Sequence, residues 1–163
     1  MKGLNIFSEP AIIEKVKDLY NLLKQEKNEY EKAASKIINK QLYHTLITLA
    51  NGHNKFAEEL CAQVKKITGD DDIKQCKEHK IFLAPEVFKN DFEIYAFCRM
   101  NEKQLVNAYQ EILNHSFLYS GLNKILRSQL NEILCSFTEL KLLSKFKANK
   151  NNKNDYSGLS VLL

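Results

Sequence analysis

The chain has 163 residues, a formal net charge of +4 and 44% hydrophobic residues, but only five glycines and two prolines. A chain of this length can form one domain with a full core, and so few turn-forming residues argue against a β fold, which needs a turn about every ten residues. The weak positive charge is not gathered into a basic motif, which argues against nucleic acid as a partner.

Neither a membrane span nor a signal peptide is expected. No apolar run approaches the roughly 18 residues that a membrane helix needs, and residues 8–10, Ser-Glu-Pro, interrupt the apolar start of the chain. The four cysteines form no Cys-x-x-Cys pair, which is typical of free thiols in a reducing compartment. We therefore expect a cytoplasmic protein with no membrane partner.

Apolar stripes with helical spacing predict the first two helices. Apolar residues recur every three or four positions over residues 12–37 and again over residues 42–67. We expect Asn39 to end the first helix, and Gly69 to end the second in a left-handed conformation. The short connection between two long helices predicts an antiparallel hairpin.

The third and fourth helices follow from the same spacing. The third is expected to begin at Asp91, or as early as Pro85, with its apolar stripe over residues 88–113. The fourth carries its stripe over residues 118–143. Residues 70–90 are interpreted as a short helix or a packed loop, long enough to span the bundle. The predicted fold is all-α, an antiparallel four-helix bundle with a longer connection between helices 2 and 3.

The end of the chain differs in composition from the helices. Residues 147–155 are rich in Lys and Asn and show no burial pattern, whereas Leu159 to Leu163 are mostly apolar. We expect one bundle domain over residues 1–146 and a mobile tail over residues 147–163. The apolar end of the tail predicts docking on the bundle or on a protein partner.

Polar residues interrupt three stripes at core positions, namely Glu26, His53 and Glu102. Residues 26 and 53 are equally far from a first turn at residues 39/40, about 20 Å at 1.5 Å per residue, so they should face each other at one depth. If the second turn lies near residue 115, Glu102 and Gln129 also lie near helix centre. Each of the four helices is then expected to contribute one polar group to a single layer.

Two interpretations of this layer stay open. Two carboxylates and a neutral imidazole suit one divalent ion, such as iron, manganese or zinc. Alternatively, no cofactor is bound, and Glu26 and Glu102 pair with His53, Arg99 or Gln129, because buried charges must be neutralised or hydrogen-bonded.

The remaining candidates have weaker support. His44 and His115 lie near helix ends and are expected at the surface. Cys76 and His79 have ligand chemistry but lack the four ligands of a structural zinc site. No glycine-rich phosphate loop or nucleophile motif is present in the sequence, so nothing favours a transferase or a hydrolase.

Several short segments resemble helices of the ferritin-like superfamily and, more narrowly, of an uncharacterised bacterial four-helix-bundle family, a domain of unknown function. They are VKDLYNLL (16–23) and YEKAA (30–34) for the first helix, CRMNE (98–102) and AYQE (108–111) for the third, and LRSQLNEI (126–133) for the fourth. Together they are distributed over most of residues 12–146, in the order and spacing of that family.

This resemblance implies a degenerate metal site. The better-known relatives hold two metal ions with a Glu on each of two helices and Glu-x-x-His on each of the others. The single glutamates are present here, but Ala50 stands where a Glu would precede His53, and Gln129-x-x-Glu132 replaces the second motif. At most one metal ion is therefore expected.

From these observations we expect a bacterial, non-catalytic stress-related or interaction protein with an incomplete metal layer, which forms a homo-oligomer. The alternative is a metal-binding protein or metal-dependent oxidoreductase. Its metal ligands would be Glu26, His53 and Glu102, with Gln129 and Glu132 as neighbours.

Overall fold

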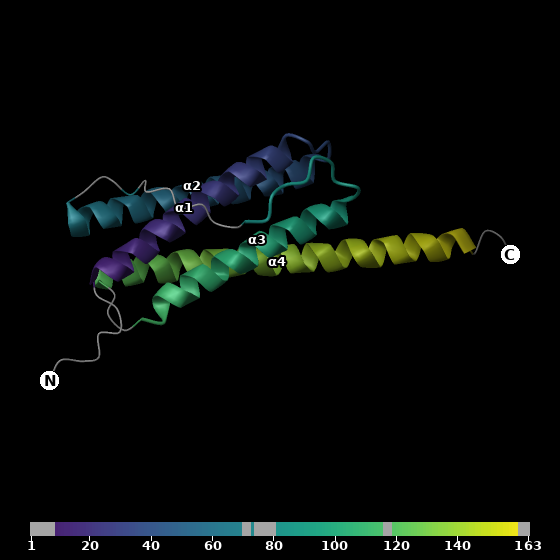
Figure 1. Ribbon diagram of the computed structural model, residues 1–163. Helices are drawn as coiled ribbons and strands as arrows, with labels where there is room; N and C mark the ends of the chain where they lie inside the picture. The colour runs from purple at the N-terminus through teal and green to yellow at the C-terminus, as the bar shows by residue number, and fades with distance from the viewer. Residues whose placement is uncertain (1–8, 70–72, 74–80, 116–118, 160–163) are drawn as a thin grey trace.

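The computed structural model describes residues 9–69, 73, 81–115 and 119–159, with side chains described from residue 11 to residue 145 of these ranges. This part of the chain contains the helices α1 (Glu9–Ala34), α2 (Lys40–Thr68), α3 (Asp91–Leu113) and α4 (Ser120–Leu159) (Figure 1). The predicted all-α four-helix bundle is confirmed.

The helices pair in the order expected for two hairpins joined by a crossing connection. α1 packs mainly against α2, and α3 against α4, while α1 also contacts α3 and α2 contacts α4. In Figure 1, α1 and α4 run in one direction and α2 and α3 in the other, so contacting helices are antiparallel. α2 ends at one end of the bundle and α3 begins at the other. The chain therefore passes along the whole bundle between Gly69 and Asp91.

Capping residues fix both ends of α2, and the first of them corrects our prediction that Asn39 ends the first helix. The Asn39 side chain accepts hydrogen bonds from two backbone N–H groups in the first turn of α2, so Asn39 starts this helix, whereas α1 already ends at Ala34. A short amide satisfies the free N–H groups of a helix start well. Gly69 ends α2 with φ 73°, as predicted.

α4 is longer than expected, because it continues to Leu159 rather than ending near Phe146. Residues 147–157 contain no proline or glycine, so no residue there stops a helix. The domain boundary at residue 146 stays a prediction. Within the described residues, no helix is both long and apolar enough to span a membrane.

Most of the main predicted stripe of α3 is buried, namely Tyr95, Glu102, Val106 and Tyr109. Its other positions are more exposed: Phe92 is 53% exposed and Arg99 is only half-buried. The neighbouring stripe is fully buried, and it consists of Ile94, Cys98, Leu105 and Ile112.

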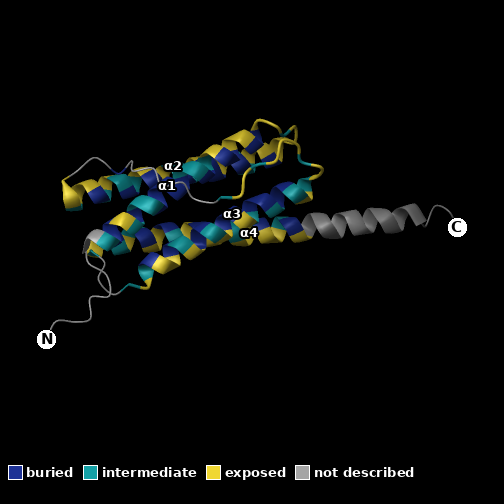
Figure 2. Ribbon diagram, viewed as in Figure 1, coloured by how far each residue is buried: buried dark blue, intermediate teal, exposed yellow. Residues whose placement is uncertain are grey.

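The core is divided into two apolar clusters along the bundle, and buried residues line the inner helix faces (Figure 2). The first cluster contains Leu23 of α1, Phe56 of α2 and Leu105 of α3. The second contains Tyr30, Ala50 and Cys98 of the same helices. Glu26, His53 and Glu102 fall between these positions on the three helices, and we call this level the polar layer.

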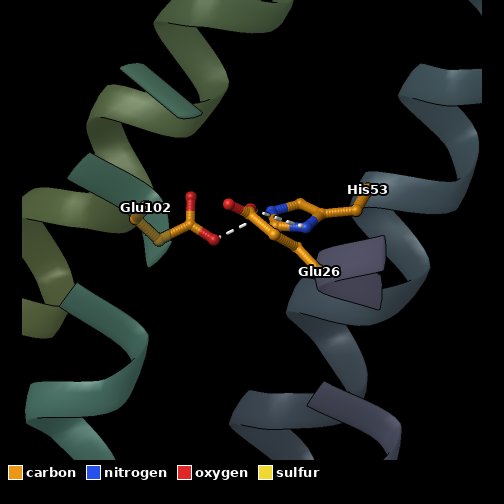
Figure 3. A group of neighbouring side chains, drawn as sticks. All are labelled: Glu26, His53 and Glu102. Atoms are coloured by element: carbon orange, nitrogen blue, oxygen red, sulfur yellow. Dashed lines mark ion pairs between the residues drawn. The ribbon is translucent and has the colours of Figure 1, made fainter. Parts of the chain in front are cut away.

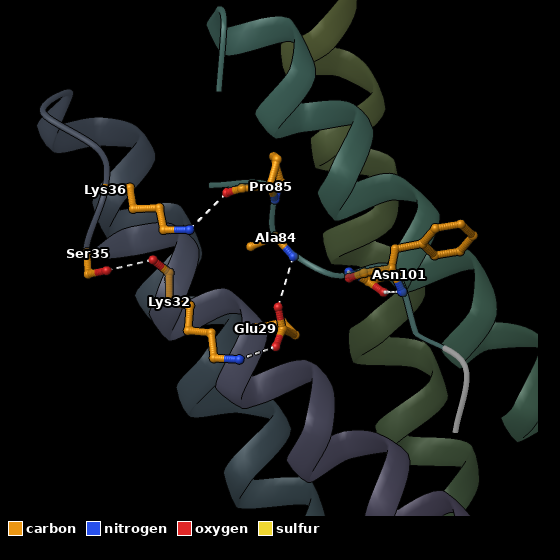
Figure 4. A network of polar contacts seen from close by, with 8 residues as sticks. Glu29, Lys32, Ser35, Lys36, Ala84, Pro85 and Asn101 are labelled. Atoms are coloured by element: carbon orange, nitrogen blue, oxygen red, sulfur yellow. Dashed lines mark hydrogen bonds and ion pairs between the residues drawn. The ribbon is translucent and has the colours of Figure 1, made fainter. Parts of the chain in front are cut away.

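The connection between α2 and α3 is a packed loop, not a helix, over its described residues 81–90. Residues 81–85, which we call the strap, lie between α1 and α3 (Figure 4). The strap bonds to side chains of both helices and to Lys36 in the turn after α1. It therefore fills part of the seam between α1 and α3.

Candidate metal centre

Glu26 of α1, His53 of α2 and Glu102 of α3 meet in the polar layer (Figure 3). Their exposed fractions are 0%, 2% and 0%. Each offers one ligand atom, and these atoms lie within 4.8 Å of one another. The predicted equal depth of the three residues is confirmed. We call them the triad.

The imidazole of His53 lies between the two carboxylates. Its Nε2 is 2.8 Å from Glu102 Oε1, and its Nδ1 is 3.7 Å from Glu26 Oε2. The first distance is short, but its direction does not suit a hydrogen bond, and both imidazole nitrogens and both oxygens of Glu26 lack a hydrogen-bond partner. Buried polar atoms are rarely left in this state. The lone pairs of the triad are therefore available to bind a cation.

Tyr30 supports the triad from the second apolar cluster. Its hydroxyl donates to Glu102 Oε1 at 2.9 Å and to the carbonyl oxygen of Cys98 at 3.3 Å, and its ring centroid is 5.2 Å from that of His53. Burial, reinforced by the charge of Glu102, raises the pKa of the Tyr30 phenol well above its usual value. Tyr30 therefore stays protonated and acts as a donor that orients Glu102.

Sequence reasoning treated Tyr30 only as part of the apolar stripe. A signal was present, because this tyrosine lies one helical turn after Glu26, and a tyrosine hydroxyl needs a partner when it is buried. Asn101 and Glu29 are also buried polar residues, and they need hydrogen-bond partners for the same reason. The sequence assigns neither residue a role, because single polar residues carry no periodic signal.

The charge of the layer is unbalanced without a cation or a proton. Burial is the largest cause that raises the pKa of Glu26 well above 4.5, and the nearby Glu102 carboxylate adds to it. Among the described residues, the only basic side chain that ion-pairs with either carboxylate is His53. The expected alternative pairing with Arg99 is therefore not found. Two ionised glutamates and a neutral imidazole would together balance one divalent ion.

Gln129 is fully buried, but it bonds to residues beside the triad rather than to the triad itself, so its place in a four-helix layer stays a prediction. Its side-chain amide donates to the carbonyl oxygen of Phe56, one helical turn after His53, at 3.2 Å. It accepts a hydrogen bond from the Tyr109 hydroxyl at 2.7 Å and donates to Glu59 Oε2 at 2.9 Å. Burial is the largest cause that raises the pKa of the Tyr109 phenol, which also lies near enough to the layer for the charges of Glu102 and Glu26 to raise this pKa further. Glu132 is exposed and does not join the triad.

Within the described residues, the other candidate ligands, His44 and His115, are not brought to the triad. His44 is exposed, as expected, and His115 is half-buried. Cys76 and His79 lie outside the described residues. Ala50, at the position where the resemblance would require a Glu, is buried in the second apolar cluster.

The span of the triad is close to that of a metal coordination sphere. Metal–ligand bonds of about 2.0–2.2 Å place the ligand atoms of one ion roughly 3 to 4.4 Å apart. The observed limit of 4.8 Å therefore requires only small side-chain rotations. Mixed carboxylate and imidazole donors suit iron, manganese or zinc.

The structure thus shows a four-helix all-α domain with a buried Glu/His/Glu triad. The resemblance to the ferritin-like superfamily remains a prediction. No family model, no curated protein and no solved structure matches the chain.

Proposed function

We propose that this protein binds one divalent transition-metal ion in the core of its helical bundle, with Glu26, His53 and Glu102 as ligands. The observation that carries the proposal is the convergence of three fully buried ligand groups within 4.8 Å. Nearly all of their polar atoms lack a hydrogen-bond partner. Iron, manganese and zinc are the ions that this donor set favours.

The metal-free network is the competing proposal, and the direction of the contacts argues against it. A network of this kind requires the imidazole to donate to a carboxylate along its N–H bond. Nε2 of His53 is close enough to Glu102 at 2.8 Å, yet the pair does not have hydrogen-bond geometry. Two atoms that point their lone pairs at a common ion are close to each other without being aligned with each other.

The burial of the triad favours a binding role over catalysis. Surface grooves lie elsewhere: one of about 410 Å³ between α1 and α3 is lined by Leu22 and Gln104, and one of about 220 Å³ between α2 and α4 is lined by Thr48 and Ser136. A substrate larger than a few atoms would have to displace the core to touch the ion. We therefore infer a non-catalytic metal-binding protein, with a metal-dependent oxidoreductase as the alternative.

The test is metal content and its dependence on the triad. Protein purified from iron-supplemented cells should hold one metal ion per chain, measured by mass spectrometry of the elements. His53→Ala should abolish binding, whereas His44→Ala should not, because His44 lies on the same helix but is exposed. A folded wild-type protein that binds none of Fe²⁺, Mn²⁺, Zn²⁺ and Co²⁺ would refute the proposal.

The catalytic alternative has its own readout. An oxidoreductase loaded with Fe²⁺ should consume oxygen repeatedly in the presence of a reductant, at a rate that His53→Ala abolishes. A binding protein should show no turnover beyond the stoichiometry of its iron.

We also propose self-association and a stress-related or interaction role in which the C-terminal residues contact a partner. This part rests on the sequence alone. Deletion of residues 156–163 should change the mass measured by light scattering or remove a partner captured by the full chain. If neither changes, the tail has no such role.

A further inference from the structure

The strap crosses the polar layer on its outer side. Ile81, at the start of the strap, packs against the first apolar cluster, and Ala84 packs against the second. Phe82 and Leu83 lie between these two residues in the chain and therefore pass the level of the triad, in the seam between α1 and α3.

Side chains next to the two metal-ligand glutamates hold the strap. Asn101, the neighbour of Glu102, accepts from the Phe82 N–H at 3.2 Å and donates to the Phe82 carbonyl at 3.0 Å. Glu29, one turn after Glu26, accepts from the Ala84 N–H at 2.9 Å. The strap is therefore attached to the two helices that carry the carboxylates.

A further contact ties the strap to the turn after α1, where Lys36 donates to the carbonyl of Pro85 at 2.9 Å. Glu29 itself is fixed by Lys32, whose ammonium is 2.7 Å from Glu29 Oε1. The strap is thus held mainly by polar contacts from helix side chains.

The strap buries little apolar surface of its own. Phe82 is 42% exposed and Leu83 is 68% exposed, and residues 81–85 form no helix. Segments held by a few hydrogen bonds open more readily than segments held by a packed core. Separation of α1 from α2, or of α3 from α4, would instead expose buried apolar side chains of both clusters.

We propose that the strap is the gate through which a metal ion enters and leaves the triad. This inference rests on the proposed metal binding and adds its kinetic control. An ion cannot reach side chains that are at most 2% exposed unless some part of the protein moves. Within the described residues at this level, the strap is non-helical and has two largely exposed apolar side chains, Phe82 and Leu83.

A gate has a kinetic signature that a ligand does not have. If the strap opens in the same way with and without metal, easier opening multiplies the association rate and the dissociation rate by the same factor. The dissociation constant then stays constant, because it is the ratio of the two rates. Loss of a ligand, or general loosening of the core, raises the dissociation constant instead.

The experiment compares Co²⁺ exchange in the wild type with that in Asn101→Ala and Glu29→Ala. Stopped-flow absorbance of bound Co²⁺ gives the association rate, and transfer to excess EDTA gives the dissociation rate. We expect both rates to rise at least tenfold in each variant, with the dissociation constant within threefold of the wild-type value. Glu111→Gln is the matched control, because Glu111 accepts from Lys15 across the same seam, away from the strap, and it should leave both rates unchanged.

A second measurement uses the wild-type protein alone and does not depend on any variant folding. Hydrogen exchange of the Phe82 and Ala84 amides reports the rate at which the strap opens when it is measured at a pH high enough for exchange to be faster than reclosing. Metal release to EDTA should be no faster than this opening rate, and release that is faster would overturn the gate.

The outcomes separate the two proposals. Co²⁺ that binds with wild-type rates in both strap variants would overturn the gate and leave metal binding intact. A rise in the dissociation constant with unchanged association would also overturn it. Absence of Co²⁺ binding in the wild-type protein would remove the proposed function and the gate together.

Discussion

Glu26→Gln tests the charge balance of the polar layer in metal-free protein. Burial and the neighbouring Glu102 raise the pKa of Glu26 well above 4.5 in the folded state. Below pH 4.5 the side chain is protonated in both the folded and the unfolded chain, so its ionisation does not affect stability. Above pH 4.5 the unfolded chain releases this proton first, and the free energy of unfolding falls as the pH rises toward the folded-state pKa.

The size of the effect has an upper limit. Each pH unit in this window lowers the free energy of unfolding by about 1.4 kcal/mol, so the loss between pH 5 and pH 7 is at most about 2.7 kcal/mol. Glutamine keeps the shape and does not ionise. Because no hydrogen bond holds either oxygen of Glu26, little is lost by the exchange. We expect Glu26→Gln to become more stable than the wild type as the pH rises, by about 1–2 kcal/mol at pH 7.

Urea denaturation in EDTA at several values between pH 5 and pH 8 measures this difference directly. Glu31→Gln is the control, because Glu31 lies on the same helix but is exposed, and it should show no comparable trend. A stability difference between Glu26→Gln and the wild type that does not change with pH would refute the reasoning. If Glu26→Gln instead lowers the free energy of unfolding by several kcal/mol at pH 7, the Glu26 carboxylate has a fixed partner.

Metal should reverse the order of stability, so that the wild type becomes more stable than Glu26→Gln. An ion present at 100 times its dissociation constant stabilises the protein that binds it by about 2.7 kcal/mol. Only the wild type should gain this, because Glu26→Gln lacks one charged ligand. Thermal unfolding with and without Zn²⁺ checks the reversal, and equal shifts in both proteins would contradict it.

Three further predictions follow from side-chain and backbone geometry. Tyr30→Phe should weaken metal binding by about 10–100-fold, because the lost hydroxyl orients a ligand carboxylate; competition titration measures this, and Tyr109→Phe, whose hydroxyl bonds to a different side chain, should bind normally. Gly52→Ala should stabilise the protein by about 0.5–1 kcal/mol in urea denaturation, since a Cβ at this position of α2 meets no atom within 4 Å. Gly69→Ala should destabilise the protein by about 1 kcal/mol in the same assay, because Gly69 has a positive φ. Leu23→Ala should cost about 2–5 kcal/mol in the same assay because Leu23 is fully buried; a loss under 1 kcal/mol would contradict that.

The helical stripes were sufficient to predict the fold and the common depth of the triad. The hairpin between α1 and α2 is short, so distance from its turn determines which residues face each other, and Glu26 and His53 do so. The burial of Gln129 also follows from its place in the stripe of the fourth helix. Its membership of the polar layer stays a prediction, because its hydrogen bonds run to Tyr109, Phe56 and Glu59 rather than to the triad.

The strap and Tyr30 could not be found from periodicity. The contacts of Asn101 and Glu29 with the strap join residues far apart in the sequence, and nothing in either helix marks them as different from other polar positions. The role of Tyr30 depends on the side chain opposite it on α3. Such pairings arise only once the helices are packed.

The division of the interior into two apolar clusters has a consequence for how the bundle comes apart. Along α1, α2 and α3 the clusters meet at a plane of polar side chains, where water can replace lost contacts at lower cost than in a continuous core. A break in cooperativity would therefore begin at this plane, with one end of the bundle melting before the other. An ion that joins three helices at the plane would couple the two ends and make them unfold as one.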